Sequence, residues 1–140
     1  MTTKSEGILT YVSGLLSNVS GVSGRVWRSR ADPIRREETP AIIITQMQEV
    51  ASYNLIDFVD WEMQFKVTVH ARGVTPDNAA DPVTQSVYAI LMADRSLGGR
   101  AFDILPAGFY PQIIEGDQNI LITDMVFTVR YRTKASDLTQ

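Results

Sequence analysis

The sequence predicts an α+β domain in which two helices pack on one face of a mostly antiparallel sheet whose strands differ in length. Two amphipathic segments of helical period, at residues 3–18 and 77–93, predict the helices. Two long alternations of apolar and polar residues, at 61–71 and 120–133, predict the central strands. The chain has 140 residues, 44% of them hydrophobic, which suits a single domain spanning 1–140.

The first predicted helix follows from apolar residues that recur three and four positions apart. They are Ile8, Leu9, Val12, Leu15, Leu16 and Val19. Thr3 and Ser5 are candidate N-caps, because a hydroxyl group can accept a hydrogen bond from a backbone N–H of the first turn. The serine- and glycine-rich residues 17–24 end this helix, and a short strand is predicted at 25–29.

Residues 30–40 are predicted to form an exposed charged loop. Pro33 and Pro40 interrupt regular structure there, and charged residues of both signs dominate the segment. The β-branched run 41–45 predicts a strand that is covered on both faces and runs on through 46–50 toward a sheet edge.

The two long alternations predict the centre of the sheet. Residues 61–71 place apolar side chains on one face and polar side chains, His70 among them, on the other. Residues 120–133 repeat this pattern with a long apolar set, so the two strands are predicted to be neighbours.

The second half of the chain contains one further helix and two shorter strands. The sequence Thr75-Pro76-Asp77 predicts the start of the helix at 77–93, since proline is favoured in a first turn. Strands are predicted at 101–105 and 110–115, separated by Pro106-Ala107-Gly108.

Composition excludes several classes of site. Without cysteine there is no disulfide, no thiolate metal site and no cysteine nucleophile. The longest apolar runs fall far short of the roughly 20 residues of a membrane helix, so no membrane partner is expected. The N-terminal residues do not have the pattern of a secretory signal, and we expect synthesis in the cytoplasm of the producing cell.

Charge is unevenly distributed along the chain. The net charge is −3, which argues against a protein that mainly holds nucleic acid electrostatically. Residues 25–38 carry a local charge of +2, and the rest of the chain carries −5. The protein is therefore expected to have a basic arm on an acidic body.

No catalytic residue, metal ligand or cofactor is predicted. His70 is the only histidine, and no second histidine or cysteine is available to complete a common transition-metal site. The carboxylate pairs Asp57/Asp60 and Asp77/Asp81 do not have the spacing of a calcium loop.

A protein interface is the favoured kind of site. Arginine forms forked pairs with carboxylates at interfaces, and apolar residues among charged ones indicate surface left for a partner. The candidate interface residues are Arg28, Arg30, Ile34, Arg35, Arg36, Asp57, Phe58 and Asp60. The arginines are candidates to pair with Asp57 and Asp60 of a neighbouring copy.

Several segments, read in order, resemble the tail terminator, or tail completion, proteins of tailed bacteriophages, of the lambda type. They are Arg25-Val26-Trp27-Arg28-Ser29-Arg30, residues 38–44, residues 65–73, Ala80-Asp81-Pro82, residues 94–99 and residues 127–133. The resemblance implies a small α+β subunit that assembles as a homohexameric ring and carries out no catalysis.

The same resemblance implies a place in the virion, in the tail or neck region. There the ring would cap the head-proximal end of the tail tube, contact the tail tube protein, and join the tail to neck or head completion proteins. The genome would pass through its lumen without sequence-specific binding. Two other hypotheses stay open: another head-tail connector or head completion ring subunit, and a small single-stranded-DNA-binding module suggested by Trp27 among arginines.

Overall fold

The computed structural model describes residues 2–140, and of Arg36 it describes the backbone alone. The elements in chain order are α1 Lys4–Leu16, β1 Val26–Arg28, the short 3₁₀ helix η1 Arg36–Glu38, β2 Ala41–Asn54, β3 Phe58–Gly73, α2 Pro76–Ala93, β4 Asp103–Ile114 and β5 Asn119–Lys134. The five strands form one sheet in the order β1-β2-β3-β5-β4. β1 runs parallel to β2, and all other neighbouring strands are antiparallel.

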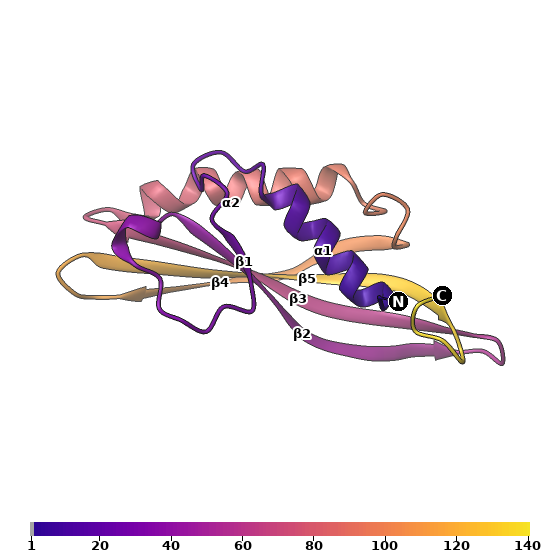
Figure 1. Cartoon of the computed structure of the whole chain (residues 1–140). Coiled ribbons are helices and arrows are strands. Elements are labelled where there is room, and N and C mark those ends of the chain that lie inside the picture. Colours follow the sequence, from indigo (N-terminus) through magenta and orange to yellow (C-terminus); the bar gives the residue numbers. More distant parts are fainter. Residues whose placement is uncertain (1) are drawn as a thin grey trace.

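Both helices lie on the same face of the sheet (Figure 1), which confirms the predicted fold class. Thr3 caps α1, because its hydroxyl accepts a hydrogen bond of 3.2 Å from the backbone N–H of Glu6. Tyr11 on α1 donates a hydrogen bond of 2.6 Å to Asp94, directly after α2. This bond links the two helices, which form one layer on the sheet.

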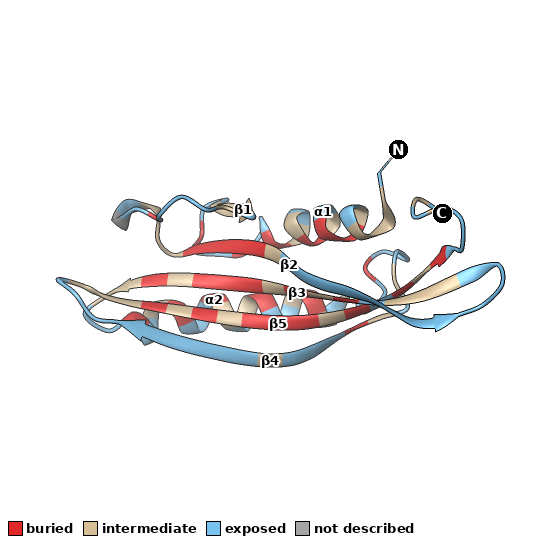
Figure 2. Ribbon diagram, turned by 90° about the horizontal axis from the view of Figure 1, so that it is seen from below, coloured by how far each residue is buried: buried red, intermediate tan, exposed pale blue. Residues whose placement is uncertain are grey.

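The predicted central strands are neighbours, and both are longer than the sequence indicated. β3 and β5 pair along their full lengths, from Phe58 opposite Lys134 to Gly73 opposite Asn119. Their helix-facing side chains alternate with polar ones, as Figure 2 shows by alternating burial along both strands. Phe65 and Phe127 stack at the centre of the main core.

The prediction of two short strands at 101–105 and 110–115 is wrong, because β4 is one continuous strand. Its pairing with β5 shifts register between Pro106 and Gly108, so the proline and glycine form a bulge instead of ending the strand. β4 tolerates the prolines because it is an edge strand, which needs no hydrogen-bond donors on its free side.

The segment 30–40 is more ordered than the predicted exposed loop. It contains η1, and Ile34 is only 6% exposed in a small cluster with Trp27, Ala41 and Ile43. Ile42 and Ile44 belong to the main core, and successive residues of a strand point to opposite faces. The segment therefore covers the start of β2 on the sheet face opposite the helices.

Candidate interaction site

The predicted interface residues lie in two places that the fold holds apart. We name residues 28–38 the arginine segment and residues 53–60, where β2 turns into β3, the hairpin tip. The arginine segment leads into the start of β2, where Ala41 pairs with His70. The hairpin tip lies at the opposite end of the same two strands, where Asn54 pairs with Val59. Figure 1 shows the β2–β3 hairpin extending beyond both helices.

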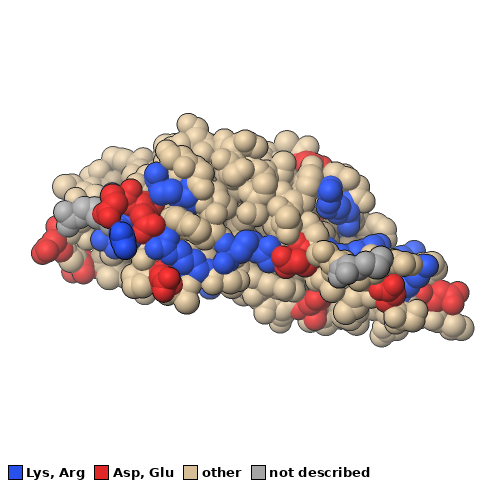
Figure 3. Space-filling view, in the orientation of Figure 1, with Lys and Arg blue, Asp and Glu red and all other residues tan. Residues whose placement is uncertain are grey.

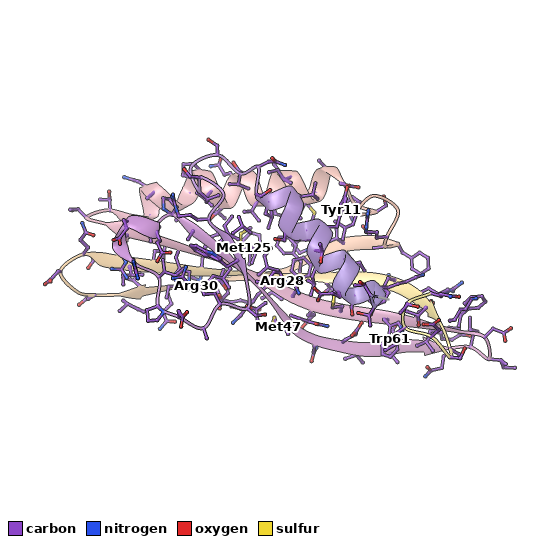
Figure 4. The ribbon with its side chains drawn as sticks, in the orientation of Figure 1. Tyr11, Arg28, Arg30, Met47, Trp61 and Met125 are labelled. Atoms are coloured by element: carbon purple, nitrogen blue, oxygen red, sulfur yellow. The ribbon has the colours of Figure 1, made fainter. Side chains whose placement is uncertain are left out.

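Arg28 is bound within its own chain. Its guanidinium donates two hydrogen bonds, of 3.1 and 3.0 Å, to the carboxylate of Glu6 on α1. The hydrogen bonds from Arg28 lower the pKa of Glu6. Arg28 therefore ties β1 to α1, and Figure 4 shows it beside that strand.

Arg30 organises the arginine segment. Its guanidinium forms a forked pair with Glu38, with both hydrogen bonds at 3.0 Å, and lies 4.2 Å from the centre of the Trp27 ring. It also donates to the carbonyl of Pro33 at 3.0 Å. The hydrogen bonds from Arg30, and then the bond from the Arg35 backbone N–H, lower the pKa of Glu38 to about 2.

We expect the Arg30–Glu38 pair to stabilise the fold in a pH-dependent way. Because the pKa of Glu38 falls from an ordinary 4.5 to about 2, the stabilisation is fully present above about pH 4.5 and is lost as the pH falls through 2. Glu38→Gln should therefore unfold more easily than wild type at pH 6, and the difference should shrink steadily toward pH 2. Urea unfolding at a series of pH values measures it.

The control for this prediction is the neighbouring residue Glu37, which is exposed and forms no ion pair among the described residues. Glu37→Gln should follow the wild-type pH profile. A gap between Glu38→Gln and wild type that stays constant from pH 6 to pH 2 would contradict the assignment.

The other two predicted positions of the arginine segment differ in exposure. Arg35 is exposed, and its side chain forms no ion pair within the described part of the chain. The side chain of Arg36 lies outside the described residues. Ile34 was predicted as an exposed contact, but its burial makes it a packing residue, because the segment folds back on Ala41 and Ile43.

The hairpin tip is held rigid by the last strand. Arg132 on β5 forms a forked pair with Asp60, at 2.6 and 3.2 Å, and lies over the ring of Phe58 at 5.5 Å. The hydrogen bonds from Arg132 lower the pKa of Asp60. The Trp61 indole N–H donates to the Thr133 hydroxyl at 3.0 Å. Asp60 therefore serves to position the hairpin, whereas Phe58 remains 39% exposed.

Apolar side chains are exposed along the hairpin. Ile56 at the turn is 97% exposed, and Tyr53 is 60% exposed. The predicted contact Asp57 is exposed beside Ile56. Sequence reasoning did not identify Met47 and Tyr53 as exposed positions. The short length of β1 was a signal for them, because a short first strand leaves most of β2 without a neighbour on that side. β1 pairs with β2 only as far as Ile44, so the rest of β2 has a free edge.

A second apolar surface lies between α2 and β4, and sequence reasoning missed it. A groove of about 620 Å³ is lined by Thr84, Gln85, Tyr88, Pro106, Ala107, Gly108 and Phe109. The rings of Tyr88 and Phe109 meet edge to face, with centres 6.0 Å apart. These residues come together only when β4 packs at the sheet edge, so their spacing in the sequence carried no signal.

The residues weighed for chemistry are dispersed in the fold. His70 is partly buried on β3, and burial lowers its pKa. Asp81 on α2 accepts a hydrogen bond of 2.7 Å from Gln85. Within residues 2–140, no three acidic or histidine side chains gather in a way that could hold a metal ion. Of the helices described, none is long and apolar enough to cross a membrane.

Charged side chains follow the side of the molecule where β1 lies. Figure 3 shows lysine and arginine side chains in a broken band along the middle of this side, with acidic side chains between them and toward both ends.

Comparison with known proteins gives a structural likeness. No protein-family model matches the chain, and no curated protein matches it. Among solved structures, a chain from the virion of a native gene transfer agent particle is similar. The two share a TM-score of 0.56 and 14% sequence identity, over 90% of this chain and 92% of that one. The two chains therefore share a fold along nearly their whole lengths.

Proposed function

We propose that this chain is a structural subunit of a phage-like virion, and that it is a ring-forming tail terminator. The observation that carries the proposal is the fold shared with a virion chain over 90% of this chain and 92% of the other. A match over both lengths covers two whole subunits and not one common supersecondary motif, and it supports a structural role by analogy of fold. The family resemblance of residues 25–133 supports the finer role.

The surface supports a function in assembly. The hairpin tip is rigid and apolar, and contiguous exposed apolar surface commonly marks a contact with another protein. The groove between α2 and β4 is a separate surface, because β5 lies between β4 and the β2–β3 hairpin in the sheet. A single subunit therefore offers two different surfaces. Contacts between different surfaces of identical subunits generate rings when the rotation between neighbours closes, and open filaments when it does not.

In this proposal the ring is a homohexamer in the tail or neck region of the virion, assembled in the host cytoplasm. It caps the head-proximal end of the tail tube, contacts the tail tube protein, and joins the tube to neck or head completion proteins. The genome passes through the lumen without sequence-specific contacts. A ring that encloses the genome in this way needs no catalytic residue, metal or cofactor.

The single-stranded-DNA hypothesis loses its main support in the structure. It required a free face of Trp27 for base stacking. Arg30 lies 4.2 Å over that ring and is itself held by Glu38, while Trp27 packs against the cluster of Ile34, Ala41 and Ile43. The Trp27 ring and the Arg30 guanidinium therefore contact each other instead of presenting a free face to a base.

Particles assembled without this chain test the proposal. A terminator ends tube growth, so its removal should give tubes of irregular, excessive length that fail to join heads, as seen by negative-stain microscopy. Gold-tagged chain added back should label one end of each tube, and isolated protein should form six-fold rings. Tubes of normal length with unsealed heads would favour the alternative of a head-tail connector or head completion ring. Particles that never contain the chain would contradict a virion role.

A further inference from the structure

The two edges of the sheet differ in net charge, which is positive near β1 and negative near β4. We propose that copies of this chain join side by side, with the β1 edge of one copy against the β4 edge of the next. This inference rests on the proposed ring and specifies the joint between its subunits. The occupant of the exposed β4 edge is thus a second copy, recognised by complementary charge.

The β1 edge carries guanidinium groups without acidic partners. Arg25, directly before β1, donates to the backbone carbonyls of Pro40 and Gly21, at 3.1 and 3.3 Å. Arg72, at the end of the central strand β3, donates to the carbonyl of Ile34 in the arginine segment at 2.9 Å. Among the described residues, neither these two nor Arg35 has a carboxylate within ion-pair distance. Asp32 and Glu37 of the same segment are also exposed without an ion pair in the described chain, so the edge keeps a net positive charge, +2 over residues 25–38, and not cations alone.

The opposite edge is acidic. The sequence from 76 to 117, which covers α2, β4 and the turn after it, contains six acidic and two basic residues. Asp77, Glu115 and Asp117 are exposed and form no ion pair in the described chain. A hollow of about 270 Å³ between the start of α2 and the end of β4 is lined by Asp77, Ile113 and Asn119. The three carboxylates thus belong to one corner of the molecule.

The basic and acidic groups lie at the same end of the sheet. The arginine segment enters β2 where Ala41 pairs with His70, near the end of β3. The turn that bears Glu115 and Asp117 joins β4 to β5, where Asn119 pairs with Gly73 at that same end. A rotation about an axis along the strands keeps each group at its height. It therefore brings the arginines of one copy to the carboxylates of the next.

At the end of the sheet that bears these charges the contact is made by side chains, because neither edge offers a long row of free donors there. β1 has three residues, and Pro106 and Pro111 remove two N–H groups from β4. Tyr110 on β4 is 61% exposed and presents a ring on which a guanidinium can lie. The β4 edge thus offers aromatic surface flanked by negative charge to an arginine-bearing partner.

Charge reversal tests the joint in a way that a general loss of stability cannot imitate. R35E places a carboxylate opposite Glu115 and Asp117 of the next copy, and the double variant E115R/D117R places two guanidinium groups opposite Arg35. Each protein alone should need about tenfold higher concentration to form rings than wild type. An equimolar mixture should recover rings, because alternating copies restore opposite charges at every joint. Native mass spectrometry counts the subunits and shows the alternation.

Two controls define the outcome. K134E reverses an exposed charge at the far end of the sheet and should assemble as wild type does. Raising the salt to 1 M should weaken wild-type rings, since the screening length falls to about 3 Å. Single variants that assemble normally, or a mixture that stays unassembled, would overturn this joint while leaving the ring intact. Wild-type protein that forms no ring, alone or on tail tubes, would overturn both the joint and the proposed function.

Discussion

Replacing Phe127 with alanine is expected to lower the free energy of unfolding by about 3–5 kcal/mol, because the substitution leaves a cavity where the core cannot collapse. Phe127 is fully buried on β5, and its ring stacks on Phe65 with centres 5.7 Å apart. It also meets Phe109 of the edge strand, at 6.3 Å. One ring thus joins three strands. Domains of this size are stable by about 5–15 kcal/mol, so the variant should be close to unfolded at 37 °C.

The matched control is Phe109→Ala, which removes an aromatic ring that is 43% exposed. It should lose clearly less stability than Phe127→Ala, because water already reaches that ring and can fill the space. Urea unfolding followed by tryptophan fluorescence measures both variants. Equal losses would mean that the edge strand, and not the β3–β5 pair, forms the centre of the core.

The central strands could be predicted because the signal for each strand lies within its own residues. Burial on one face of a sheet imposes a period of two, and that period was visible at residues 61–71 and 120–133. Likewise the apolar stripe of α1 and the Pro76 start of α2 report the face and the first turn of each helix. The fold class followed from these elements and their order.

The features that could not be predicted depend on contacts distant in sequence. Ile34 has charged neighbours on its C-terminal side, yet Trp27, Ala41 and Ile43 bury it once the segment folds across the sheet. Asp60 was predicted to meet a partner's arginine, but Arg132 holds it, 72 positions away. A single sequence shows which residues are charged and does not show which charges the fold itself neutralises.

The exposure of the hairpin tip was predicted from the mixture of apolar and acidic residues around Asp57. The structure adds that the base of the tip is tied to the last strand. Arg132 and Trp61 fix the base of the hairpin, and the Ala135 backbone N–H donates to the Asp57 carbonyl at 2.8 Å. A rigid apolar tip loses little conformational entropy on binding, which favours a strong contact.

If the chain is the terminator proposed above, replacing Ile56 with asparagine is expected to weaken its attachment to the tail tube or neck about thirtyfold, the loss of about 2 kcal/mol typical of an interface hot spot. The side chain is 97% exposed, so its removal should change the free energy of unfolding by less than about 0.5 kcal/mol. Sedimentation of the chain with purified tubes measures attachment, and urea unfolding measures stability. Ring formation should persist, because the proposed joint lies at the other end of the sheet.

Val74→Asn is the matched control, since Val74 is 89% exposed and lies between β3 and α2, away from the hairpin. Because Val74 lines the same hollow as Asp77, the ring content of both variants is measured before their attachment is compared. Both variants exchange an exposed aliphatic side chain for the same amide. If apolar exposure alone promoted attachment, the two would bind equally poorly. If the rigid hairpin tip is the contact, only Ile56→Asn loses binding, because only that side chain is displayed on a hairpin fixed by Arg132. Normal attachment of Ile56→Asn would assign the tube contact to another surface, of which the α2–β4 groove is the next to test by Tyr88→Ala.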